Sequence, residues 1–151
     1  MNSLDAYQDN RESEILNAGP LELVVMLYRA AITSLADARR HLKAGDIRQR
    51  SKAISKVSAI LSELAQSLDH EKGGSIAKNL TELYDYLQHL ILRANIEQIE
   101  LPLVEAATLL GTLLEGWETC VSAPVLSSAY QSQHEEEYVS IACNFLSLLY
   151  D

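Results

Sequence analysis

The sequence predicts an all-α protein: an antiparallel up-down-up-down four-helix bundle with an N-terminal arm and an extra C-terminal helix. Apolar residues recur every three or four positions through most of the chain, and no strand-like alternation persists. Only six Gly and three Pro in 151 residues favour long helices with short connections. This length suits one domain with a single core, and one Phe and one Trp make that core largely aliphatic.

The chain begins with a polar stretch, residues 1–18, that we interpret as an extended or partly helical arm. The first bundle helix starts at Pro20, because proline suits a position whose N–H has no helical partner. Glu22 places negative charge in the first turn, where the helix dipole favours it. Gly45 is expected to end this helix, and Asp46 to cap the next.

The second and third helices carry the most regular apolar patterns. The second has a seam of Ile47, Ile54, Val57, Leu61, Leu64 and Leu68, with Ile60 beside it. Gly73-Gly74 separates it from a third helix, expected from about Ser75 to Ile96. The third helix has a main seam of Ile76, Leu80, Leu83, Leu87, Leu90 and Ala94, and a second row of Ala77, Tyr84 and Ile91. Two rows indicate either deep burial or one core row plus one row for a partner.

The fourth helix is expected from Pro102 to Val121, which completes a bundle domain over residues 19–121. Gly111 and Gly116 weaken it by about 0.5–1 kcal/mol each relative to Ala, and such glycines often allow a neighbour to approach closely. Residues 122–151 form a tail with a predicted helix at about 133–149. Its apolar face consists of Tyr138, Ile141, Ala142, Phe145, Leu148 and Leu149.

Composition argues against several classes of partner. The formal net charge is -9, which disfavours nucleic acid and anionic membrane surfaces, since both attract clustered Lys and Arg. No apolar run approaches the roughly 20 residues of a membrane span, and residues 1–11 lack the apolar region of a signal peptide. We therefore expect a cytosolic protein.

Catalytic, metal and cofactor sites are not expected. The four histidines form no HExxH-type pair, and Ser67, Asp69 and His70 are too close in sequence to build a triad. Cys120 and Cys143 lack zinc spacing; we expect two reduced thiols, although the sequence leaves a disulfide between them open. Glu135, Glu136 and Glu137 are read as a helix start rather than a cation site.

A binding function fits better. Seven tyrosines accompany the single phenylalanine, and tyrosine offers apolar area with a polar tip, as a groove requires. For Tyr28 and Tyr84 a purely structural role is equally open. In that role each side chain ends a row of core residues and its hydroxyl lies at the rim of the core.

Several motifs follow one another in order over residues 7–121: Tyr7-Gln8, Ile15, Ala18-Gly19-Pro20, Leu23-Val24-Val25-Met26-Leu27-Tyr28, Gly45-Asp46, and the run from Leu68-Asp69 to Tyr84-Asp85-Tyr86. In this order they resemble the flagellin export chaperone family (FliS). Gly19 stands where the family usually has serine, and glycine is nearly as good there.

The resemblance implies a cytosolic chaperone that binds the disordered C-terminal segment of flagellin, prevents premature polymerisation and aids delivery to the flagellar type III export gate. It also implies that an arm around Tyr7, Gln8 and Ile15 covers part of the groove. We expect a monomer or weak homodimer. We place the client surface on Ile54, Val57, Leu61, Ile76, Leu80, Leu83, Tyr84 and Leu87, with Asn79 holding client backbone. Alternatives are a regulatory binder of another flagellar protein, such as the anti-sigma factor, and, far behind, a small helical enzyme.

The tail departs from the family pattern. The stretch from Asn144 to Leu149 resembles the C-terminal end of flagellin, which reads Asn-x-Leu-x-Leu-Leu. One interpretation is a client mimic that occupies the groove, in the same molecule or in a neighbour. The other is a plain fifth helix or a chance Leu-rich end. The candidate mimic residues are Tyr138, Ile141, Phe145, Leu148 and Leu149.

Overall fold

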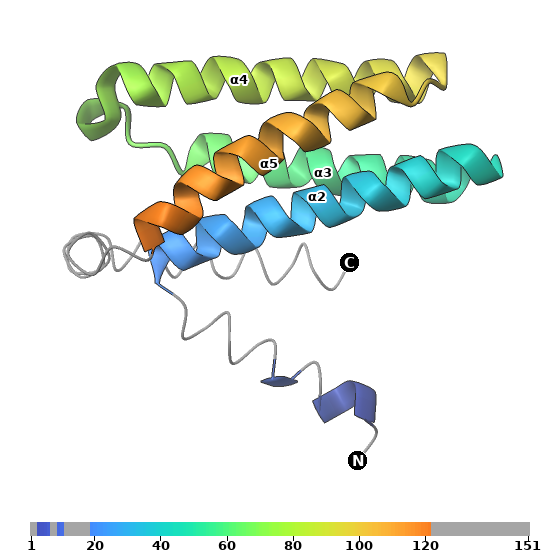
Figure 1. Cartoon of the computed structure of the whole chain (residues 1–151), viewed down its shortest axis with the longest axis horizontal. Helices are drawn as coiled ribbons and strands as arrows, with labels where there is room; N and C mark the ends of the chain where they lie inside the picture. The colour runs from blue at the N-terminus through green and yellow to red at the C-terminus, as the bar shows by residue number, and fades with distance from the viewer. Residues whose placement is uncertain (1–2, 7–8, 11–18, 122–151) are drawn as a thin grey trace.

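The computed structural model describes residues 3–6, 9–10 and 19–121. Its long helices are α2 (Pro20–Ala44), α3 (Ile47–Gln66), α4 (His70–Glu97) and α5 (Leu101–Val121), and residues 3–6 form a further helical turn. Successive long helices run antiparallel (Figure 1), and the described residues contain no strand. The predicted all-α class and four-helix bundle are confirmed, whereas the predicted helix at 133–149 lies outside the described residues.

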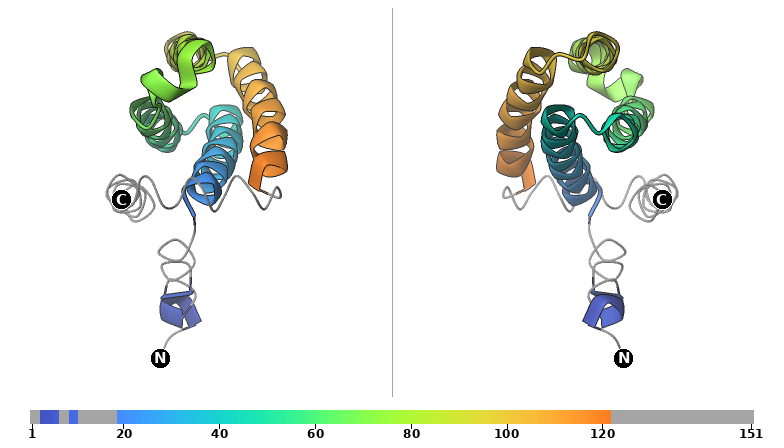
Figure 2. Two further views of the ribbon diagram at one scale, coloured as in Figure 1. Left: turned by 90° about the vertical axis from the view of Figure 1, so that its left-hand side faces the viewer. Right: turned by 90° about the vertical axis from the view of Figure 1, so that its right-hand side faces the viewer.

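The four helices form a ring in chain order when the bundle is viewed along its length (Figure 2). α2 packs against α3 and α5, and α4 packs against the same two helices. The core on the bundle axis is aliphatic, as expected from the composition. Its fully buried leucines include Leu23, Leu27, Leu35, Leu61, Leu64, Leu87, Leu103 and Leu110.

The start of α2 and the corner between α2 and α3 are built as the sequence predicts. The Gly19 N–H donates to the Glu22 carboxylate at 3.2 Å, which stabilises the start of α2. Gly45 ends α2 with φ +71°, a left-handed conformation that glycine adopts at little cost. The Asp46 carboxylate then accepts the Gln49 N–H at 3.1 Å and caps α3.

The start of α4 differs from the predicted one. The helix begins at His70 rather than Ser75, because the Asp69 carboxylate accepts the N–H groups of Glu71 and Lys72, each at 3.0 Å. Gly74 interrupts the regular helix with φ +50° and ψ -122°. α4 therefore consists of one capped turn, a kink and a long second part.

A close neighbour is present at Gly73 and not at the glycines of α5. A Cβ at Gly73 would lie 2.8 Å from the Cβ of Ala77. Nothing lies within 4 Å of a Cβ placed at Gly111 or Gly116, so the expected close approach there is wrong.

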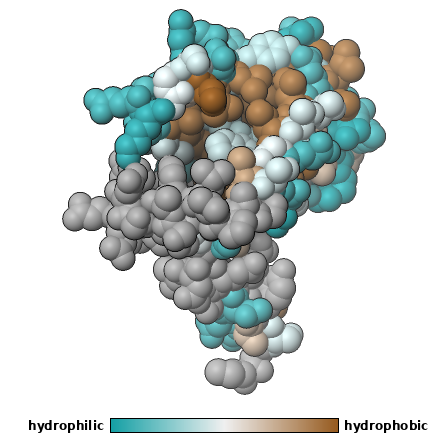
Figure 3. Space-filling view, turned by 60° about the vertical axis from the view of Figure 1, so that its left-hand side comes forward, coloured by the Kyte–Doolittle hydropathy of each residue, from teal (hydrophilic) through white to brown (hydrophobic). Residues whose placement is uncertain are grey.

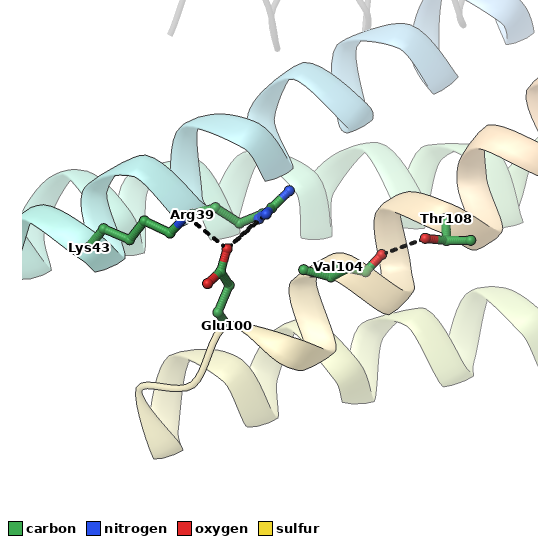
Figure 4. Close-up of polar contacts among 5 residues, drawn as sticks. All are labelled: Arg39, Lys43, Glu100, Val104 and Thr108. Atoms are coloured by element: carbon green, nitrogen blue, oxygen red, sulfur yellow. Dashed lines mark hydrogen bonds and ion pairs between the residues drawn. The ribbon is translucent and has the colours of Figure 1, made fainter.

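An ionic cluster joins the α4–α5 connection to the C-terminal end of α2 (Figure 4). One Glu100 carboxylate oxygen accepts from the Arg39 guanidinium at 2.7 and 2.9 Å, and lies 3.2 Å from the Lys43 ammonium. Hydrogen bonds from Arg39 and then Lys43 lower the pKa of Glu100 below its ordinary value. This end of the bundle is therefore held by charge as well as by packing.

Polar contacts also join α3 to α4. Arg50 is only 4% exposed, and its guanidinium donates to the Asn95 side-chain oxygen at 3.1 Å. Farther along, the Ser58 hydroxyl donates to the Gln88 side-chain oxygen at 2.7 Å, and the Gln88 amide donates back to the Ser58 carbonyl at 2.9 Å.

Candidate binding site

An apolar cavity of about 260 Å³ lies at the end of the bundle opposite Glu100. α2 and α4 begin there, and α3 and α5 end there (Figure 1). With this end brought forward, Figure 3 shows hydrophobic surface gathered around a hollow and bordered by hydrophilic side chains. The apolar lining comes from all four helices: Leu21, Val24, Leu64, Leu68, Ile76, Ala77, Leu80, Tyr84 and Trp117.

Three aromatic residues connect this cavity to the core. The hydroxyls of Tyr28 and Tyr84 are 2.6 Å apart, and the ring centroid of Tyr28 lies 6.5 Å from that of Tyr84 and 6.3 Å from that of Trp117. Burial raises the pKa of both tyrosines above 10.0, so both stay neutral at physiological pH. Because the hydroxyls lie inside the protein and bond to each other, neither sits at a rim as one interpretation of the sequence proposed.

The outer face of α4 forms the rim of the cavity. Ile76 is 68% exposed although it is apolar, and Leu80 beside it is half-buried. Asn79 is exposed and Leu83 is half-buried. These four predicted client residues can be reached from outside.

The remaining predicted client residues belong to the core. Tyr84 lines the cavity, although its side chain is buried. Four others are buried in the described conformation, where they support the helices that carry the rim: Ile54, Val57, Leu61 and Leu87. The predicted arm residues Tyr7, Gln8 and Ile15 and the predicted mimic residues 138–149 lie outside the described residues.

Two other hollows are larger but more polar in their lining. One of about 410 Å³ between α2 and α3 is lined in part by Asp37, His41, Lys52 and Lys56. Another of about 500 Å³ between α3 and α4 is lined in part by serines and amides, including the Ser58–Gln88 pair. An apolar ligand would have to desolvate these groups, so the end cavity is the better candidate.

The sequence interpretation missed Leu21, Val24 and Trp117, which lie at helix ends. Their shared position becomes visible only when the four helices are arranged as a bundle. Trp117 could have been singled out as the only tryptophan, since this residue is common in binding surfaces.

Within the described ranges, no group of His, Cys, Asp or Glu could hold a metal ion. None of the described helices is long and apolar enough to span a membrane. Cys120 is a free, half-buried thiol, and Cys143 lies outside the described residues.

Comparison with known proteins identifies the family. The sequence profile of the family described as "Flagellar protein FliS" matches residues 2–124. The chain belongs to the FliS family. The resemblance first suggested by the motifs is thereby confirmed, and it covers the whole described bundle.

Named members of the FliS family are similar along most of their length. The flagellar secretion chaperone FliS of Salmonella typhimurium is 38% identical over 117 residues, which cover 76% of this chain and 87% of the relative. The protein of the same name from Campylobacter jejuni is 33% identical over 112 residues, with 74% and 88% covered. The flagellar secretion chaperone FliSB of Pseudomonas aeruginosa is 30% identical over 119 residues, with 78% and 94% covered.

Proposed function

We propose that this chain is a non-catalytic flagellar secretion chaperone. It binds the disordered C-terminal segment of flagellin in the cytosol, prevents premature polymerisation, and aids delivery to the type III export gate. The observation that carries the proposal is the apolar end cavity with its exposed Ile76 rim, in a chain of the FliS family.

The physical basis is recognition of an amphipathic helix by an apolar groove. A disordered client loses conformational entropy when it folds on this surface, and that loss offsets part of the contact energy. The result is a specific complex that can still dissociate when the client is handed to the export gate.

We place the client on Ile76 and Leu80 at the cavity and on Leu83 farther along α4, with Asn79 available to hydrogen-bond client backbone. Tyr84 forms part of the cavity wall. Its buried neighbours hold that wall in position. The arm around Tyr7, Gln8 and Ile15 covers part of this surface, outside the cavity itself, until the client displaces it.

The test is a pair of matched substitutions on α4. Ile76→Glu puts a charge at the cavity, whereas Ile96→Glu puts the same charge at a site of nearly equal exposure, 69% against 68%, at the other end of the helix. We expect Ile76→Glu to weaken binding of a flagellin C-terminal peptide about 30-fold, the effect of losing about 2 kcal/mol at a binding hot spot. We expect Ile96→Glu to leave the affinity within about twofold, close to the small effect of surface changes away from a site.

Isothermal titration calorimetry measures both affinities, and circular dichroism checks that each variant is folded. Equal affinities for folded Ile76→Glu and the parent would overturn the placement of the client. Equal losses in both variants would indicate a charge effect rather than a site.

A further inference from the structure

We propose that the C-terminal tail of this chain places its apolar face in the end cavity, with Phe145 as the inserted side chain. The tail would then compete with the client, and this regulatory consequence rests on the proposed function. The contact itself can be tested without any client.

The first argument is the position from which the tail starts. α5 ends at Val121, one turn beyond Trp117, which lines the cavity. Residues 122–137 separate this point from the predicted apolar face. A linker of this length with random-coil statistics would span roughly 20–25 Å on average, and it would start one turn from the cavity.

The second argument is the chemistry of the tail. Tyr138, Ile141 and Phe145 recur at helical spacing, and Leu148 and Leu149 continue the same face. Ser140 and Ser147 fall on the opposite face. An isolated helix of this length is marginal in water, so it requires an apolar surface to be stable.

The third argument is size. A cavity of about 150 Å³ is enough to bind a benzene-sized ring. The end cavity, at about 260 Å³, therefore accommodates a phenylalanine ring together with part of an aliphatic neighbour. Phe145 is the only phenylalanine in the chain.

The fourth argument is that the tail does not belong to the shared bundle. The FliS family match ends at residue 124, whereas the chain continues to Asp151. The cavity lining lies within the match, and the proposed occupant lies outside it. The proposed covering therefore involves a segment that lies beyond the family match.

Tethering makes a weak contact effective. A short flexible linker gives an effective concentration of about 1 mM. If the free tail binds with a dissociation constant of roughly 100 μM, the cavity is occupied about ten times more often than it is open. A client must then compete against roughly a tenfold reduction in apparent affinity.

Trp117 provides a direct readout, because it is the only tryptophan and it lines the cavity. In the full-length chain, we expect Phe145→Asp to shift Trp117 emission to longer wavelength and to increase quenching by acrylamide. The matched control Ser147→Asp adds the same charge to the opposite face and should change neither. A synthetic peptide of residues 133–151 added to the Phe145→Asp variant should restore the parent emission.

Three outcomes would overturn the contact. Trp117 emission could be the same in Phe145→Asp and the parent. Tyr7→Asp could shift the emission when Phe145→Asp does not, which would make the N-terminal arm the occupant. The emission could also change with protein concentration alongside dimerisation, which would assign the occupant to a second copy.

A flagellin C-terminal peptide then separates this inference from the proposed function. We expect Phe145→Asp to bind the peptide about tenfold more tightly than the parent. A shift of Trp117 emission without tighter binding of the peptide would overturn the proposed competition, but it would still support the contact between tail and cavity. If neither the parent nor Phe145→Asp binds the peptide, the result counts against the proposed function and not against the contact between tail and cavity.

Discussion

At the scale of single residues, the buried tyrosine pair shows how polar atoms enter an apolar core. Each hydroxyl needs a partner because water does not reach it. Tyr28 and Tyr84 supply that partner to each other across α2 and α4, and the ring of Trp117 packs near that of Tyr28. Tyrosine at these positions therefore links α2 and α4 through a contact that phenylalanine could not make.

We expect Tyr84→Phe to lower the free energy of unfolding by about 1–2 kcal/mol, because the Tyr28 hydroxyl loses its partner while the ring packing is kept. Tyr28→Phe should cost a similar amount. The double variant should cost clearly less than the sum, since no hydroxyl is then left alone. Urea unfolding of the four proteins gives the coupling free energy, and strictly additive losses would contradict the paired role.

At the scale of elements, the predictions that depend on local chemistry agree best with the structure. Gly45 and Asp46 form the expected corner because both act on neighbouring backbone. Ile47 was placed in the α3 seam but is 58% exposed, whereas Ile60, placed beside the seam, is 1% exposed. Ile47 is the first residue of α3, and Ile60 lies next to Leu61 on an apolar stripe that is wider than a strict heptad seam.

The two apolar rows of α4 illustrate what periodicity leaves open. Ala77, Tyr84 and Ile91 of the second row are buried, and so are Leu87, Leu90 and Ala94 of the main seam, while Ile76 at the start of the main seam is exposed. The spacing shows that both rows exist. How far each row is covered along the helix is set by packing against α3 and α5.

Two glycine substitutions test the local rules in opposite directions. Gly45→Ala should destabilise the protein by about 1 kcal/mol, because a Cβ is unfavourable at φ +71°. Gly111→Ala should stabilise it by about 0.5–1 kcal/mol, because the site is helical and has room for a Cβ. Thermal unfolding compares them directly, and a loss of stability in Gly111→Ala would indicate a neighbour that approaches in solution.

At the scale of the whole molecule, the two ends of the bundle differ in kind. One end is held by Glu100 with Arg39 and Lys43, and the other has the apolar cavity. The periodic pattern predicted the bundle but neither end. Both depend on residues that are distant in sequence, such as Arg39 and Glu100, and meet only after folding.

The ionic end predicts a defined pH dependence. The folded-state pKa of Glu100 lies below its ordinary value of 4.5, so its charge stabilises the protein above that pH and this contribution is lost as the pH falls through the folded pKa. We expect Glu100→Gln to lower the melting temperature at pH 7. The difference from the parent should shrink below about pH 4.5 and vanish in stronger acid.

Glu97→Gln is the matched control for Glu100→Gln. Among the described residues, Glu97 forms an ion pair with Arg93 one turn away on the same helix, at 3.2 Å, and both side chains are more than half exposed. It should change the melting temperature little. A pH-independent loss in Glu100→Gln would show that packing, rather than charge, accounts for the effect.

The kink at Gly74 has a consequence for the range of ligands. The turn before it is held by Asp69, and the cavity rim at Ile76 follows directly after it. Rotation about one glycine can therefore move that capped turn relative to the rest of α4 without breaking the core contacts made farther along the helix. We therefore expect the mouth to adjust at this one position, so that partners with side chains of different size fit the same bundle.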